Sequence, residues 1–142
     1  MLKYTSNANE VITNLVNGLK GIEPLLDEIG DYMYNSVKDR IFNQGLDENN
    51  QSIGKYTNFT KKKRQKKGLQ TSIVDLKFEG NLINSFTIQK GKYSIKVGVF
   101  DTKESIIAVK NEIHFGKKIF SFTEADFKQV ESMVSALVDK IK

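Results

Sequence analysis

The sequence contains no cysteine and no tryptophan, and its 142 residues include one proline and one histidine. Without cysteine, the chain can form no disulfide bond, no thiolate metal site and no thiol nucleophile. This composition fits a protein that folds in a reducing cytosol. The single proline, Pro24, leaves no proline-rich linker that would divide the chain into two domains.

Long apolar segments are also missing. No apolar run approaches the roughly 20 residues that a membrane-spanning helix needs, and residues 1–7 show no signal-peptide pattern. Apolar residues nevertheless make up 39% of the chain, which is enough for a packed core. A chain of this length suits one core, so we expect residues 1–142 to form a single domain.

The positive charge is concentrated in residues 61–67. The formal net charge is +5, from 22 basic and 17 acidic residues. Six of the basic residues lie in this segment, so the rest of the chain has 16 basic residues against 17 acidic ones. Because burying an unpaired cation is costly, we expect all six to face water, an acidic partner or phosphates. The six are Lys61, Lys62, Lys63, Arg64, Lys66 and Lys67.

Apolar residues at helical spacing predict two helices in the N-terminal part, residues 8–43. The first covers about 8–20 and the second about 23–43. Pro24 suits the first turn of the second helix, and Gly45 suits the position just after its end.

The segment 123–142 predicts a long C-terminal helix. Thr123 can cap it, and Asp126 can take the place of the usual Glu in a capping box. Phe122 and Phe127 occupy the two positions of a hydrophobic staple around this cap.

Between these helices, residues 45–70 are polar and show no clear apolar period, which predicts a long extended loop with the basic segment at its far end. Residues 71–122 are expected to be rich in β structure. Their patterns predict a strand at 72–76 and a hairpin formed by 86–89 and 93–99.

Residues 104–116 fit either the start of a helix or a buried strand. Together the patterns predict an α+β fold, in which N-terminal helices and a long C-terminal helix pack on a small antiparallel sheet, with a long polar and basic loop.

The sequence shows no convincing active site. His114 could be a general base or a metal ligand, but no second His or Cys accompanies it, so a surface or half-buried histidine near a turn is the favoured interpretation. Residues 47–50 lack the ligand spacing of an EF-hand and are expected to form a solvated loop. No glycine-rich phosphate loop is present. We therefore expect no enzyme activity, no cofactor and no metal.

Three interpretations of the basic segment stay open at this point. It can be a solvated loop, a contact to the phosphate backbone of a nucleic acid, or a docking element for an acidic protein ring. Sequence-specific base recognition is not expected, because no recognition helix accompanies it.

The order of several punctuating residues resembles the phage virion-morphogenesis, or tail-completion, family to which the Mu G-like proteins belong. The family pattern is a helix ending in Phe and Gly, an aromatic residue before a Lys/Arg-rich stretch, a short apolar segment ending in Leu, a Gly-x-Leu-x-x-Ser turn, a hairpin, and an aromatic-Gly end. The corresponding positions here, called the motif positions below, are Phe42, Gly45, Tyr56, Leu76, Gly80, Leu82, Ser85, His114, Phe115 and Gly116. Tyr56 stands where many relatives have Trp, and the stretch before the last helix lacks their Pro-Ala-Arg-Pro-like sequence.

The resemblance implies a structural virion protein rather than an enzyme. Such subunits form a ring, six-fold in the family, at the head–tail junction, where the ring completes the tail and joins it to the head. The implied partners are other copies of the chain, connector or adaptor proteins, tail terminator or tube proteins, and packaged DNA, with no membrane. The protein would be assembled in the cytoplasm of a host bacterium.

On this basis the basic segment is expected to be an assembly loop that is flexible in the free subunit and is ordered by an acidic protein ring or DNA. The alternative function is a small non-catalytic nucleic-acid-binding module that uses the basic loop 61–67.

Overall fold

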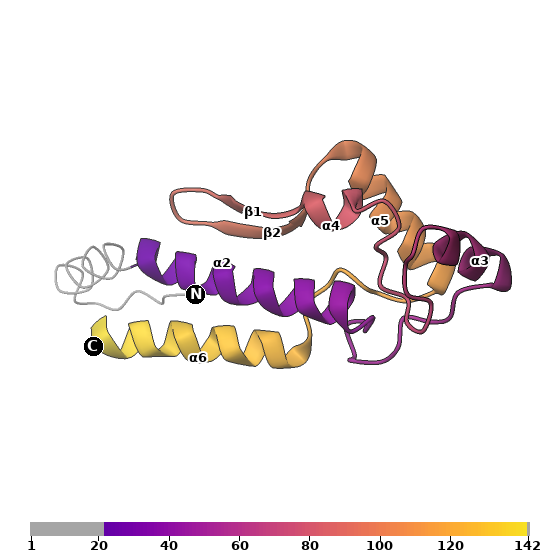
Figure 1. Cartoon of the computed structure of the whole chain (residues 1–142). Coiled ribbons are helices and arrows are strands. Elements are labelled where there is room, and N and C mark those ends of the chain that lie inside the picture. Colours follow the sequence, from indigo (N-terminus) through magenta and orange to yellow (C-terminus); the bar gives the residue numbers. More distant parts are fainter. Residues whose placement is uncertain (1–21, 142) are drawn as a thin grey trace.

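The computed structural model of the protein describes residues 22–141 (Figure 1). Within them it has five α-helices and one antiparallel sheet of two strands, which confirms the predicted α+β fold. The helix predicted for residues 8–20 lies outside the described residues. In chain order the elements are α2 (Ile22–Lys38), the π-helix η1 (Asp39–Asn43), α3 (Asn58–Lys66), α4 (Asn81–Ser85), β1 (Phe86–Lys90), β2 (Ile95–Val99), α5 (Thr102–Phe115) and α6 (Glu124–Ile141).

Helix α2 and its continuation η1 form the axis of the protein. They cover the predicted 23–43 helix, with Pro24 in the first turn. Helix α6 lies beside α2 and runs back along it, while the hairpin covers another side of α2 (Figure 1). Four buried apolar residues of this axis recur at intervals of four, a spacing that returns to one face of a helix. They are Ile29, Met33, Val37 and Ile41.

The hydrophobic core draws one or two residues each from α2, η1, α4, β1 and α5, and three more from segments between the elements. The ring of Phe86, at the start of β1, stacks on Tyr34 at 5.5 Å and meets Phe42 edge-on at 6.1 Å. This arrangement fixes the hairpin against the axis. The fully assembled cluster contains Val37, Ile41, Phe42, Ile53, Val74, Leu82, Phe86, Ala108 and Ile119.

The predicted hairpin is confirmed. Strands β1 and β2 pair from Phe86 opposite Val99 to Lys90 opposite Ile95. The second strand begins at Ile95 rather than at residue 93, because the turn takes up residues 91–94. The apolar face of the sheet lies toward α2, as expected for a small sheet that buries one side.

The predicted start of the C-terminal helix is also confirmed. The Thr123 hydroxyl accepts a hydrogen bond from the Asp126 amide at 3.1 Å, and the Asp126 carboxylate accepts one from the Thr123 amide at 3.0 Å. The rings of Phe122 and Phe127 meet edge-on at 5.8 Å. Capping box and staple therefore both form where the sequence places them.

Asp126 also ties α6 to α2. Its carboxylate accepts hydrogen bonds from the hydroxyl of Ser36 at 2.6 Å and from that of Tyr32 at 3.3 Å. Burial by itself raises the pKa of Asp126, but hydrogen bonds from Ser36, Thr123 and Tyr32 outweigh burial and lower this pKa below its ordinary value.

The prediction of an extended loop over residues 45–70 is wrong for its second half. Residues 58–66 form α3, which starts where the Thr57 hydroxyl accepts a hydrogen bond from the Thr60 amide at 3.2 Å. The helix has no apolar stripe because most of its surface faces water. The sequence of α3 therefore shows no helical period of apolar residues, although the basic segment is largely helical.

Two expectations for residues 71–122 are also wrong. Residues 72–76 form no strand, since Leu76 adopts a left-handed backbone conformation with φ of 56°. The region as a whole is not rich in β structure, because α5 occupies Thr102–Phe115 and resolves the ambiguous 104–116 segment as helix. The Asp101 carboxylate caps this helix by accepting a hydrogen bond from the Glu104 amide at 3.0 Å.

Candidate functional site

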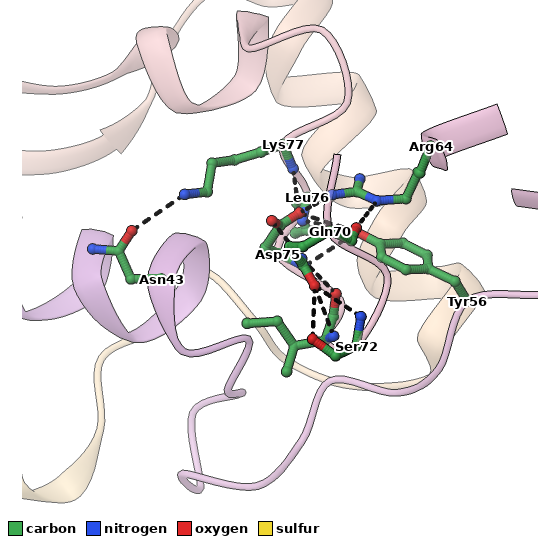
Figure 2. A network of polar contacts seen from close by, with 9 residues as sticks. Asn43, Tyr56, Arg64, Gln70, Ser72, Asp75, Leu76 and Lys77 are labelled. Atoms are coloured by element: carbon green, nitrogen blue, oxygen red, sulfur yellow. Dashed lines mark hydrogen bonds and ion pairs between the residues drawn. The ribbon is translucent and has the colours of Figure 1, made fainter. Parts of the chain in front are cut away.

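An ion pair buried inside the protein anchors the basic segment (Figure 2). Arg64 is 1% exposed, and its Nη2 donates to Asp75 Oδ1 at 2.8 Å. Its Nε donates to the carbonyl of Gln70 at 2.8 Å, and the guanidinium lies 4.4 Å from the centre of the Tyr56 ring. The expectation that all six basic residues face outward is wrong for Arg64, because Asp75 compensates its charge.

Gln70 and Tyr56 complete the network around Asp75. Gln70 Nε2 donates to Asp75 Oδ2 at 2.7 Å, while Gln70 Oε1 accepts hydrogen bonds from the amides of Ser72 and Ile73. The Tyr56 hydroxyl donates to Asp75 Oδ1 at 3.2 Å and accepts from the Asp75 amide at 3.1 Å (Figure 2). Burial, with the negative charge of Asp75, raises the pKa of Tyr56. This network holds α3 against residues 70–76.

The remaining basic residues of the segment form a lysine face on and just beyond α3. Within residues 22–141 none of them forms an ion pair. The ammonium of Lys63 lies 4.5 Å from the centre of the Phe59 ring, and that of Lys67 lies 4.3 Å from the centre of the Phe78 ring. The lysine face consists of Lys61, which is partly buried, and of the exposed Lys62, Lys63, Lys66 and Lys67.

A cavity of about 360 Å³, here called the α5 groove, lies between α3, α4 and α5. Six α5 residues line it, and four of them follow helical spacing: Glu104, Ile107, Asn111 and Phe115. Leu82 of α4 and Thr60 and Arg64 of α3 lie on the other sides. The groove therefore combines apolar walls with a few polar groups.

The opposite face of α5 carries an apolar stripe that nothing within residues 22–141 covers. Ile106, Val109 and Ile113 are 51–74% exposed and follow the i, i+3, i+7 spacing of one helix face. Large apolar side chains gathered on one face commonly mark an interaction surface.

The structure gathers six of the ten motif positions around the α5 groove. Phe42 lies in the core instead. Gly45 and Gly116 follow helix ends in the left-handed conformation, and Ser85 ends α4. The six that line the groove are Tyr56, Leu76, Gly80, Leu82, His114 and Phe115.

The other candidates for catalysis or metal binding are His114 and residues 47–50. His114 is exposed near the end of α5, with its ring edge-on to Phe115 at 4.7 Å. The expected solvated loop at residues 47–50 is wrong for Asp47, which is buried and accepts hydrogen bonds from the amides of Asn49 and Gln51. Across residues 22–141, no three His, Cys, Asp or Glu side chains come together as metal ligands would.

Sequence reasoning missed Asp75, Gln70 and Glu104. The first two lie in a segment interpreted as a strand and a loop, and their role depends on a partner in α3. The one local signal was Thr57, which stands three residues before Thr60 as a helix-capping residue does. Glu104 lines the α5 groove from the first turn of α5.

None of the helices in the described part of the chain combines the length and hydropathy that crossing a bilayer requires. The chain matches no family model, no curated protein and no solved structure.

Proposed function

We propose that the protein is a non-catalytic virion subunit that assembles with copies of itself into a ring at the junction of a phage head and tail. The observation that carries the proposal is the apolar stripe of α5. Its three large side chains lie mostly in water in the single chain. Covering them with another subunit would remove apolar surface from water, which is the main driving force of protein association.

The motif positions support the phage assignment within this proposal. Most of them surround the α5 groove, one wall of which is the helix that carries the apolar stripe. The residues that resemble the tail-completion family thus lie beside the helix that carries the apolar stripe. The ring would be six-fold and would contact a connector or adaptor, a tail terminator or the tail tube.

Replacing Ile113 by lysine is expected to prevent ring formation. Ile113 is the most exposed member of the stripe, so the change should alter the free energy of unfolding by no more than about 0.5 kcal/mol. A buried, unpaired lysine at the subunit interface would instead oppose association strongly. Sedimentation velocity over a concentration series, with negative-stain electron microscopy, measures the outcome.

Phe59→Lys is the matched control, since Phe59 lies on another helix and is similarly exposed, at 68% against 74% for Ile113. Rings from the wild type and Phe59→Lys, but not from Ile113→Lys, would support the proposal. A wild-type protein that stays monomeric alone and with tail and connector proteins would refute it.

The lysine face favours a second function, that of a small non-catalytic nucleic-acid-binding module. Its five cations lack acidic neighbours in ion-pair distance within the described residues. Replacing the four exposed lysines by glutamine should then weaken the binding of duplex DNA. It should also reduce the slope of log Kd against log salt concentration by up to about 3.6, or about 0.9 for each lost phosphate contact. Fluorescence anisotropy between 50 and 200 mM salt measures both.

The matched control replaces four exposed lysines outside the lysine face: Lys92, Lys96, Lys110 and Lys118. Equal losses in the two quadruple variants would mean that DNA responds to net charge alone, which would exclude a binding site on α3.

A further inference from the structure

Glu104 is a mostly buried residue whose carboxylate has no partner in the described part of the chain but keeps contact with the water of the α5 groove. The residue is 6% exposed and lines the α5 groove. Its amide donates to the Asp101 cap, but its carboxylate accepts no hydrogen bond and forms no ion pair within residues 22–141. The nearby N-terminus of α5 favours a negative charge there, yet buried carboxylates are normally paired. Among the other charged lining residues, Glu79 is acidic, Lys103 is basic, and the charge of Arg64 is compensated by Asp75, so the groove still suits a cationic group.

The size and walls of the α5 groove suit a protein side chain. Its volume of about 360 Å³ lies at the lower end of the range for ligand pockets, about 300–1,000 Å³. Ile107 and Phe115 provide apolar wall beside Glu104, and Asn111 adds an amide. A long side chain with a positive end, or an aromatic ring next to one, fits this chemistry.

The tip of the hairpin, residues 91–94, presents such a pair. Lys92 and Tyr93 are both exposed, and the Lys92 ammonium lies 5.3 Å from the centre of the Tyr93 ring. The neighbouring Lys90 is paired with Asp27 at 2.6 Å, whereas Lys92 forms no ion pair within residues 22–141. The tip thus offers a free cation and an aromatic ring.

The tip and the groove lie at opposite ends of the protein (Figure 1). The tip lies against the start of α2, where Lys90 at the end of β1 pairs with Asp27. The groove lies near the end of η1, where Lys77, next to the lining residues Leu76 and Phe78, donates from Nζ to Asn43 at 3.2 Å. Asp27 and Asn43 are 16 residues apart, or about 24 Å at the rise of a helix. A tip therefore cannot reach the groove of its own chain.

We infer that the hairpin tip of one copy docks in the α5 groove of the next, with the Lys92 ammonium paired to Glu104 and the Tyr93 ring against Ile107 and Phe115. This inference rests on the proposed ring and adds a second contact between neighbouring copies, on the face of α5 opposite the apolar stripe. Two complementary surfaces at opposite ends of one chain form a head-to-tail interface, and repetition of such an interface generates rings.

Cysteine cross-linking tests the contact directly, because the chain has no cysteine of its own. Tyr93→Cys and Lys103→Cys, each as a single variant, place one thiol at the tip and one at the rim of the groove. Mixed and oxidised, they should give a covalent dimer on a non-reducing gel. Gln129→Cys, at an exposed position of α6, replaces Lys103→Cys in the control mixture.

The outcomes separate the inference from the proposed function. A dimer well above the control supports the inference. Rings without a dimer above the control overturn the inference and leave the proposed function standing. A wild-type chain that never associates overturns both.

Charge variants supply the second measurement. Lys92→Gln should weaken self-association at least about tenfold, because it leaves Glu104 buried and unpaired. Lys96→Gln removes the same charge from the same hairpin away from the tip and should change association less than twofold. Adding Glu104→Gln to Lys92→Gln should weaken it no further, since the pair is already broken. Equal effects of the Lys92 and Lys96 variants would reject the pairing.

Discussion

Replacing Arg64 by alanine is expected to lower the free energy of unfolding by about 3–5 kcal/mol, because it leaves the carboxylate of Asp75 buried without its cation. Both partners are almost fully buried, at 1% and 7% side-chain exposure. The variant also removes the Arg64 contact with the Tyr56 ring and the hydrogen bond to Gln70. Urea denaturation followed by circular dichroism measures the change.

Lys62→Ala is the control, since Lys62 is an exposed residue two positions earlier in the same helix. Its effect should stay within about 0.5 kcal/mol. Arg64→Lys should fall between the two variants, because an ammonium cannot bond Asp75 and Gln70 with the fixed fork of a guanidinium. Equal stability of Arg64→Ala and Lys62→Ala would show that Arg64 is a surface cation and that the buried pair with Asp75 does not form.

Sequence patterns succeeded where the deciding contacts are local. The start of α6 depends on Thr123 and Asp126, which are three residues apart, and both hydrogen bonds of the capping box form. The β1–β2 hairpin joins two short alternating strands across a short turn. In α2, the apolar residues recur every four positions along the whole helix.

Patterns failed where a distant contact decides. Helix α3 has no apolar stripe, and the residue that holds it is Arg64, whose partner Asp75 lies 11 positions along the chain. Nothing in a run of six basic residues shows which one turns inward. Helix α5 is an exception, because Ile106, Ile107 and Val109 suit a strand as well as a helix, although the cap that resolves the choice, Asp101, lies only three residues before Glu104.

The α5 groove could not be predicted either, because three separate segments of the chain, residues 56–64, 76–82 and 103–115, supply its walls. The sequence did contain the motif positions that surround it, but a resemblance gives positions without distances. The apolar stripe of α5 can be identified only when the orientation of the helix is known, because its residues are exposed whereas Ala108 on the same helix is buried.

Gly45→Ala is expected to lower the free energy of unfolding by about 2–5 kcal/mol, through two effects. Gly45 has φ of 65°, a left-handed conformation that costs a non-glycine residue about 1–2 kcal/mol. A Cβ there would also stand 2.7 Å from the carbonyl oxygen of Val74 and 3.3 Å from Cβ of Ile73, and such overpacking costs about 1–3 kcal/mol. Thermal and urea denaturation measure the loss.

Gly68→Ala separates the two effects. Gly68 has nearly the same φ, 69°, but no atom lies within 4 Å of a Cβ added there, so only the conformational cost of about 1–2 kcal/mol remains. The difference between the variants measures how closely residues 73–74 lie against the end of η1. Equal losses would mean that this contact is looser than described. A larger loss at Gly45 would mean that close packing explains why glycine occupies this motif position. The apolar stripe of α5 would then remain the surface to test for assembly.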